Sequence, residues 1–346
     1  MKLRRQSGVT LVELLIALVL GVFIVLAATQ MFAYTKASTR SQEAAARLME
    51  NGRAATEILN RQIRMARYYG CAGVEAASVT NHYDSTKPAP AVAVSDAAMN
   101  GYHQQGLYGT DGASGAPDSI TVFQAIDDDA AVLTEAVTLD AANAIKLAAG
   151  HGFTTDSTLA ITDCTQADVI NVSGISGGDP QDLAMANCAT CTKSYNANAV
   201  VVPVKRSRFY LDTGASGERA LWVEDPWDST SKSELIEGVQ DMQIAYGRDT
   251  DADGVADQYV SVANIYDECA TSGDQNPSCW RKITSVRISL LLRSVEDFVT
   301  LQPQTYTYYG AEDPTDVSPG TDAITAADRR FYREFFTVIA LRNYRP

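Results

Sequence analysis

The sequence lacks the motifs of several common enzyme classes. It contains no phosphate-binding loop and no dinucleotide-binding fingerprint. One GxSxG pattern surrounds Ser176, but in α/β-hydrolases the catalytic histidine follows the serine and the acid along the chain. All three histidines (His82, His103 and His151) precede Ser176, and an Asp-Pro dipeptide stands where a helix should begin. The sequence therefore predicts a protein that is not an enzyme.

Positive charge is also scarce. The chain has 28 Lys and Arg residues against 42 Asp and Glu residues, which gives a formal net charge of −14 at pH 7. A surface of this sign repels a phosphate backbone. We therefore expect no nucleic acid among the partners of the protein.

A long uncharged segment lies near the N-terminus. The basic residues Lys2, Arg4 and Arg5 precede Gly8, and the run from Leu14 to Ala33 carries no charge. This run is about as long as the roughly 20 residues that cross a bilayer as a helix. A secretory signal peptide has its small-residue cleavage site after the apolar run. The small residue Gly8 comes before it, so cleavage there would leave the apolar helix at the start of the mature chain.

Glu13 is the one acidic residue in the first part of this segment. Thr10 and Glu13 have the spacing of a capping box, and a carboxylate in the first turn is also stabilised by the helix dipole. An ionised group at membrane depth is costly, however: about 2.5–3.5 kcal/mol for Asp, Lys or Arg at the centre of a helix and less near its end. Such a group is usually paired, so Glu13 is predicted to have a partner in addition to its capping role.

Charge and cysteines predict the orientation of the chain. The basic residues before the helix favour a cytoplasmic N-terminus. All six cysteines follow the helix, and an even number in an exported chain usually indicates disulfides, which require an oxidising compartment. The sequence predicts a single membrane span with the remainder of the chain outside the cytoplasm.

The helix is predicted to continue beyond the membrane. No proline occurs between Ser38 and Tyr69. Apolar or small residues recur there at steps of three and four: Leu48, Gly52, Ala55, Leu59, Ile63 and Ala66. This stripe is typical of an amphipathic helix and is predicted to pack on the globular part. Gly70 is a plausible stop, so the helix is expected to run from Leu11 to Tyr68, about 87 Å at 1.5 Å per residue.

The remainder of the chain is predicted to be rich in strands. Short segments of β-branched and aromatic residues are typical of strands: Ser119–Ile126, Thr158–Thr162, Val200–Val204, Arg206–Leu211, Thr284–Arg293 and Phe331–Arg342. No strand–helix–strand alternation follows, which favours antiparallel sheets. The segment Ala89–Gly115 is interpreted as loops. The predicted fold class is α+β, a long N-terminal helix packed on a head of antiparallel β-sheets.

The N-terminal segment resembles the class III leader of type IV pilins and type II secretion pseudopilins. That leader has Gly at the cut, an apolar residue next and Glu as the fifth mature residue, and Gly8, Val9 and Glu13 occupy these positions. Val9 stands where the family usually has Phe. The resemblance implies that a prepilin peptidase cleaves after Gly8, that the amine of Val9 is N-methylated, and that Glu13 pairs with the N-terminal amine of a neighbouring subunit and sets axial register.

Further segments resemble PilW-type minor pilins, to which pseudopilin J of type II secretion is related. These segments are Met65–Cys71 (MARYYGC), Ile161–Cys164 (ITDC), Leu235–Gly247 (LIEGVQDMQIAYG) and Ala340–Asn343 (ALRN). The resemblance implies a leader at 1–8, a transmembrane half-helix at 9–34, an amphipathic half-helix at 35–70 and a head at 71–346.

The function that the resemblance implies is structural. The chain is expected to prime assembly of a type IV pilus and to lie near its tip, and its partners are expected to be other minor pilins and the major pilin, through the N-terminal helix. It would first cross the inner membrane with its head in the periplasm and then enter the pilus. Two alternatives stay open: a J-like pseudopilin, which neighbouring genes would identify, and a membrane-anchored tip adhesin, which an exposed aromatic groove would favour.

An acidic loop carries the pattern DxDxDGxxD. It has Asp at ligand positions 1, 3, 5 and 9 of a calcium loop, namely Asp249, Asp251, Asp253 and Asp257. Gly254 occupies the turn position, and the carbonyl of Val255 would be a further ligand. Position 12 is Val260 where an EF-hand has Glu, and the flanks look like strands, so the loop is predicted to join a hairpin. We expect a weak Ca²⁺ site, with a Kd of about 10⁻⁴–10⁻³ M; the alternative is a solvated acidic turn.

The cysteine spacing indicates disulfides and not a metal site. Cys188 and Cys191 form a CxxC, but no second CxxC and no nearby histidine completes a zinc site. Cys269 and Cys279 bracket a short polar loop and are predicted to pair. The other four cysteines (Cys71, Cys164, Cys188 and Cys191) allow three connectivities, and in each of them Cys71 joins the end of the helix to a cysteine of the head.

Overall fold

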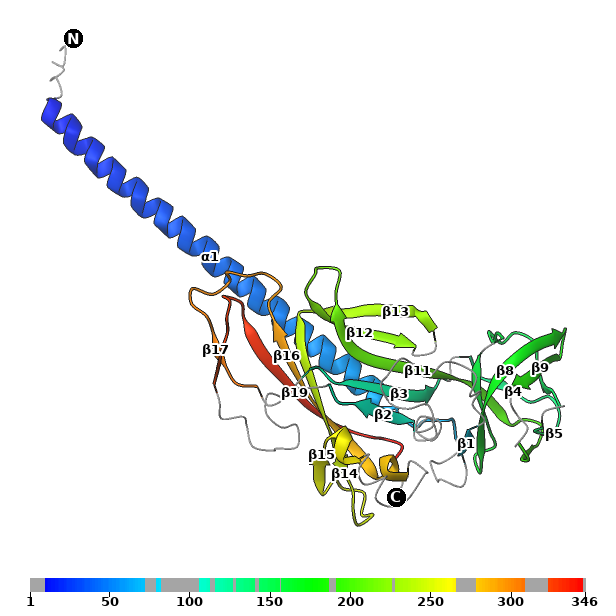
Figure 1. Ribbon diagram of the computed structural model, residues 1–346. Coiled ribbons are helices and arrows are strands. Elements are labelled where there is room, and N and C mark those ends of the chain that lie inside the picture. Colours follow the sequence, from blue (N-terminus) through cyan, green and yellow to red (C-terminus); the bar gives the residue numbers. More distant parts are fainter. Residues whose placement is uncertain are drawn as a thin grey trace, which may run out of the picture.

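A single long helix, α1 (Leu11–Arg64), projects from a head built of β-strands (Figure 1). The computed structural model describes residues 10–71, 79–81, 106–112, 116–126, 129–140, 143–155, 157–186, 191–225, 228–265, 278–308 and 323–344. The predicted α+β class is confirmed.

Helix α1 begins where the capping pattern predicts. The side chain of Thr10, the N-cap residue, accepts a hydrogen bond from the backbone N–H of Glu13 at 3.3 Å. The helix ends at Arg64, earlier than predicted. The chain leaves the helical path because Arg67 adopts a φ of +67° and donates its N–H to Phe123 O, and Tyr68 forms a parallel bridge with Gln124.

The two halves of α1 have different surroundings. The apolar residues of the N-terminal half are exposed, whereas the stripe identified in the sequence is buried: Leu48, Gly52, Ala55, Leu59 and Ile63, together with Ala66 just after the helix. This stripe packs against three strands, β13 (Asp228–Glu237), β16 (Ile283–Arg293) and β19 (Tyr332–Ala340). At Gly52 a Cβ would lie only 2.2 Å from ring carbons of Phe335, so the absence of a side chain lets helix and strand approach closely.

A four-stranded antiparallel sheet lies against the helix. Its order is β15 (Gln258–Val260), β14 (Val239–Arg248), β16 and β19. Strand β16 is buried on both faces: Ile288 and Leu290 are fully buried on one face, and Ser289 and Leu291 are at most 7% exposed on the other. The polar residues that alternate with apolar ones in β16 are therefore buried too, and they do not form a solvent-exposed face. A short 3-10 helix, η4 (Ser278–Lys282), precedes β16.

The second sheet has eleven strands. Its main path is β13, β12 (Arg219–Asp225), β11 (Val200–Thr213), β7 (Thr158–Thr162), β8 (Ala167–Gly177), β9 (Gln181–Ala186) and β6 (Ile145–Leu147), with β1 (Val79–Asn81), β2 (Leu107–Thr110), β3 (Ser119–Ala125) and β4 (Ala131–Val132) attached to it. Only β1 pairs in parallel among the described strands, with β8. Strand β2 lies in a segment that the sequence suggested would be loops, and it is held there by pairing with β3.

Strand β11 connects two lobes of the head. The sequence suggested two strands here, but one continuous strand pairs first with β4 and β7 and then with β3 and β12. One hydrophobic core contains the helix stripe, β2, β3 and the four-stranded sheet. A separate core lies in the distal lobe, which includes β6 to β9 and the small sheet of β5 (Val137–Thr138) and β10 (Ser194–Tyr195). The other small sheet pairs β17 (Thr305–Tyr306) with β18 (Ile324–Thr325).

A disulfide fastens the end of the helix to the head. Cys71 is bonded to Cys164, which lies 93 residues away in the chain. Sequence spacing could not choose this pairing among the three that it allowed. Cys191 is also disulfide-bonded. Cys188 and Cys269 lie outside the described residues, and the predicted Cys269–Cys279 pair therefore does too.

Candidate functional site: the exposed helix and the aspartate loop

The N-terminal half of α1 is an apolar rod outside the head (Figure 1). Its large apolar side chains between Leu11 and Tyr34 are all exposed, by 50% to 77%. It is the one helix in the described part of the chain that is long and apolar enough to cross a membrane, with a mean hydropathy of 2.9 over an 18-residue window, none of which is buried. Such a surface requires either lipid or other helices around it.

Glu13 lies in the first turn of this rod. Its backbone N–H is satisfied by Thr10, but its side chain is exposed and its carboxylate has no partner among the described residues. The geometry thus supports the capping role of Thr10 and leaves the carboxylate available to another molecule. Gly8 and Val9, the predicted cleavage and methylation positions, lie outside the described residues.

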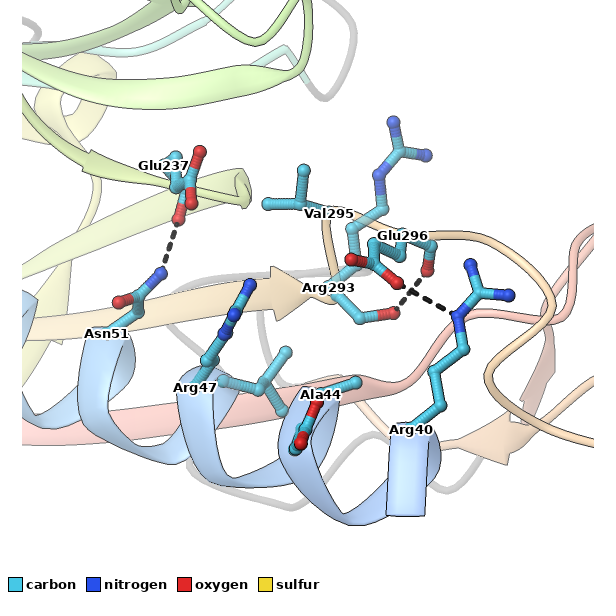
Figure 2. A pocket seen from close by; sticks show the side chains of 11 residues that line it. Arg40, Ala44, Arg47, Asn51, Glu237, Arg293, Val295 and Glu296 are labelled. Carbon is cyan, nitrogen blue, oxygen red and sulfur yellow. Dashed lines mark hydrogen bonds and ion pairs between the residues drawn. The ribbon is translucent and has the colours of Figure 1, made fainter. Parts of the chain in front are cut away.

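The helix enters the head beside a small charged cleft (Figure 2). There the guanidinium of Arg40 lies 2.9 Å from the Glu296 carboxylate and also donates to the Asp297 carbonyl at 3.2 Å. Three turns on, the side-chain amide of Asn51 donates to the carbonyl of Glu237. Both side chains of the Arg40–Glu296 pair are about half exposed, so the pair orients the helix and contributes at most about 1 kcal/mol of stability.

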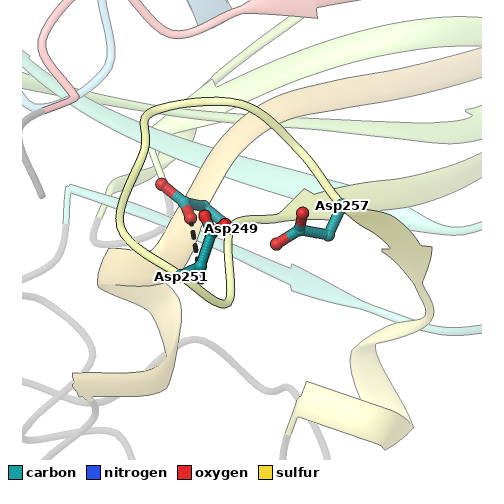
Figure 3. Close-up of side chains that lie close together, drawn as sticks. All are labelled: Asp249, Asp251 and Asp257. Atoms are coloured by element: carbon teal, nitrogen blue, oxygen red, sulfur yellow. Dashed lines mark hydrogen bonds between the residues drawn. The ribbon is translucent and has the colours of Figure 1, made fainter.

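The predicted calcium loop joins β14 to β15, as the hairpin interpretation requires. The carboxylates of Asp249, Asp251 and Asp257 offer oxygens that all lie within 4.8 Å of one another (Figure 3). Asp249 is buried, and the other two are exposed. Asp253 is outside this cluster, where its carboxylate accepts the N–H of Val255 at 2.8 Å. Three of the four predicted carboxylates are therefore brought together, and Gly254 takes the left-handed φ of +88° that the turn needs.

Hydrogen bonds favour the ionised form of two of the three clustered carboxylates, whereas the neighbouring carboxylates contribute to a raised pKa at Asp251. Burial raises the pKa of Asp249, but the Tyr344 hydroxyl, at 2.7 Å, and the N–H groups of Gly254 and Ala252 outweigh burial, so the pKa lies below its ordinary value. Hydrogen bonds from Thr250 likewise lower the pKa of Asp257. Tyr344 comes from the far end of the chain, and no signal in the sequence linked it to this loop.

The family comparisons match two parts of the chain. A family model described as Type IV Pilus-assembly protein W matches residues 208–343, and one described as Prokaryotic N-terminal methylation motif matches residues 3–29. The first match covers the four-stranded sheet and the aspartate loop; the second covers the leader and much of the exposed rod. This chain is a type IV pilus minor pilin of the PilW type. No curated protein and no solved structure matches it.

The minor pilin has a role in pilus assembly, and its leader and apolar helix indicate membrane anchoring and interaction with other pilins and a prepilin peptidase. Three of the four segments that suggested the subfamily meet at the end of α1. Cys71 bonds to Cys164, a Cβ at Gly70 would lie 2.9 Å from Thr162, and the Asn343 side chain donates to Ala66 O at 3.0 Å. These motifs therefore close the C-terminal end of the helix on the head.

The GxSxG segment around Ser176 does not form the strand–turn–helix elbow of an α/β-hydrolase. Ser176 lies in β8 and pairs with Asp182 of β9, so a strand and not a helix follows the turn. This is the arrangement of a β-hairpin, consistent with a structural pilus-assembly protein.

Proposed function

We propose that this minor pilin primes assembly of the type IV pilus and occupies a position near the tip of the filament. The observation that carries the proposal is the exposed rod: an apolar half-helix with an unpartnered carboxylate, fixed to a large head. A rod of this kind is stable in lipid and equally in a bundle of similar helices. Moving from one to the other therefore requires little change in solvation.

Glu13 would set the axial position of this helix among the helices of the bundle. A carboxylate at membrane depth is stabilised by pairing, and the free amine of Val9 in a neighbouring processed subunit would be a partner of opposite charge. The proposed partners are other minor pilins and the major pilin, all through this helix. Before assembly the chain would cross the inner membrane once, with its head in the periplasm, where the Cys71–Cys164 disulfide can form.

The size of the head supports a place at the tip. The described residues of the head form two lobes with separate cores, and the distal lobe extends away from the helix (Figure 1). Repeated at every position of a filament, such a head would crowd its neighbours. At the tip no subunit lies above it, so one or a few copies placed first would be accommodated.

The test is a clean deletion compared with two single substitutions in the complemented strain. Deletion is expected to reduce surface pili sharply while the major pilin accumulates in the inner membrane. Glu13→Ala should reproduce much of this defect. Glu50→Ala removes the same charge from an exposed position of the same helix, in the half that lies on the head, and should leave pilus number unchanged.

The other outcomes identify the alternatives. Normal pilus number in the deletion strain would refute priming and leave a tip adhesin as the better account. Normal pili together with a loss of protein secretion would indicate a J-like pseudopilin.

We further propose that the aspartate loop binds Ca²⁺ weakly. Asp249, Asp251 and Asp257 would supply carboxylate oxygens, with Asp253 and the Val255 carbonyl as additional ligands from the sequence pattern. Three clustered carboxylates suit a hard cation that prefers oxygen. With a Kd of about 10⁻⁴–10⁻³ M, 2 mM Ca²⁺ would stabilise the head by roughly 1 kcal/mol.

This proposal is tested by thermal unfolding in 2 mM Ca²⁺ and in chelator. Calcium is expected to raise the Tm of the wild-type chain by a few degrees, and Asp251→Ala should abolish most of the rise. Asp212→Ala removes the same charge from an exposed position on β11 and should preserve the rise. A wild-type Tm that does not respond to Ca²⁺ would leave the loop an acidic turn.

A further inference from the structure

Two large apolar side chains are exposed in the loop that lies beside α1 where the helix leaves the head. The segment from Val295 to Gln302, between β16 and β17, is called here the foot loop. It lies beside α1 where the helix leaves the head (Figure 1). Leu301 is 75% exposed and Phe298 is 62% exposed. Among the exposed large apolar residues of the described head, only Val255, at 64%, is similarly exposed.

The exposed orientation of Phe298 is built into the backbone. Phe298 has a φ of +59°, a conformation that costs a residue with a side chain roughly 1–2 kcal/mol. Hydrogen bonds enforce it: the N–H of Phe298 bonds to the Asp297 carboxylate, and the next two N–H groups donate to the carbonyl of Arg329, each at 3.0 Å. Val299 between them is buried. The loop is thus fastened at Val299 while Phe298 is directed outward.

The charged side chains of the foot loop and of Arg329 beside it have contacts within the protein. Glu296 pairs with Arg40 of the helix, as Figure 2 shows, and the Arg329 guanidinium lies 4.2 Å from the centre of the Phe298 ring. The N–H of Phe298 holds the pKa of Asp297 below its ordinary value. The charged groups of the loop therefore already have partners within the protein, and the exposed apolar tips are what a further partner would cover.

The position of the loop along the helix identifies the partner. A hydrocarbon core of about 30 Å takes up about 20 helical residues, which brings Tyr34 to the level of the headgroups, where aromatic residues concentrate. Arg40 lies six residues farther, about 9 Å along the axis. The headgroup layer itself is about 5–8 Å thick, so Arg40 and the loop segment that it holds lie at the outer edge of that layer.

We propose that the foot loop is a second membrane contact, in which Phe298 and Leu301 insert into the leaflet facing the head while the helix is anchored. This contact continues the lipid surface of the rod onto the head. Since the loop touches one side of the helix only, insertion would set the tilt and the rotation of the head relative to the membrane. The proposal rests on membrane anchoring of the helix and not on priming or a tip position.

The test uses the full chain reconstituted, at low protein density, into vesicles of phosphatidylethanolamine and phosphatidylglycerol. Phe298→Trp and Leu301→Trp are compared with Val255→Trp, a position of matched exposure in the aspartate loop. The three native tryptophans are corrected for with the wild-type chain. Lipids brominated in the upper acyl chain quench tryptophan that enters the interface, and quenching at 298 and 301 is expected to exceed that at 255 by at least about two-fold.

Equal quenching at all three positions would overturn the proposal. It would also be overturned if the Phe298→Trp emission changed only when other pilins were added to unbrominated vesicles, since the foot loop would then be a contact between pilins. Because both positions are exposed, neither substitution requires repacking of the core, and each serves as a check on the other.

Discussion

Replacing Gly52 by alanine tests how the helix is seated on the head. An alanine Cβ would lie 2.2–2.4 Å from three ring carbons of Phe335, whereas ordinary contact begins at 3.4 Å. The ring would have to move by more than 1 Å. Overpacking of this kind costs about 1–3 kcal/mol, and the better helix propensity of alanine offsets about 1 kcal/mol. We expect a net loss of roughly 0–2 kcal/mol relative to the wild type, or a Tm lower by up to about 4–8 °C.

The assay is thermal unfolding of the full chain in detergent, followed by near-ultraviolet circular dichroism, which reports the packing of the head. Gly21→Ala is the matched control, because it is the same change in the same helix with no atom within 4 Å of the new Cβ. It should not lower the Tm. In a Phe335→Leu background, Gly52→Ala should lose most of its effect, because the ring that it meets is gone.

Two results would refute this reasoning. One is a Gly52→Ala chain that is as stable as Gly21→Ala. The other is an undiminished loss in the Phe335→Leu background, which would show that the ring is not what the new methyl group meets.

Three further predictions concern processing, covalent structure and pH. The mature chain should begin at an N-methylated Val9, and mass spectrometry that found an intact leader, or a cut after the apolar run, would contradict the leader assignment. Replacing Cys71 and Cys164 together by serine should destabilise the head by about 4 kcal/mol on the chain-entropy account, and a Tm close to that of the wild type would show that the bond constrains little. Burial raises the pKa of Asp118 from 3.8 to about 7. The folded state then holds a proton that the unfolded state releases between roughly pH 4 and 7, so this residue makes stability fall as pH rises through that range. Asp118→Asn should flatten that part of a denaturant-midpoint profile, and an unchanged slope would exclude Asp118 as its source.

The predictions from sequence that succeeded rest on local periodicity and spacing. The stripe from Leu48 to Ile63 faces the head because residues three and four apart share one side of a helix. Thr10 caps α1 because a hydroxyl at that position reaches a free N–H of the first turn. The aspartate pattern likewise placed three carboxylates together within a single hairpin loop.

The predictions that failed or stayed open depend on partners distant in the chain. Strand β16 is covered on both faces by packing from other parts of the chain. Strand β11 continues where two strands were expected, because neighbouring strands pair with both halves of β11. Helix α1 ends early because the segment after it pairs with β3. Periodicity describes a segment by itself and carries no information about what packs against it.

The sequence alone determined the leader, the apolar rod with Glu13, the face that α1 turns to the head and the acidic loop, since each depends on residues within a few turns or one hairpin. Only the tertiary structure decided the Cys71–Cys164 bond, the Tyr344 hydroxyl on Asp249 and the Arg40–Glu296 pair that holds the foot loop beside the helix. These contacts join residues that many strands separate. They form only after the sheets have paired, and the pairing is governed by packing among all the strands together.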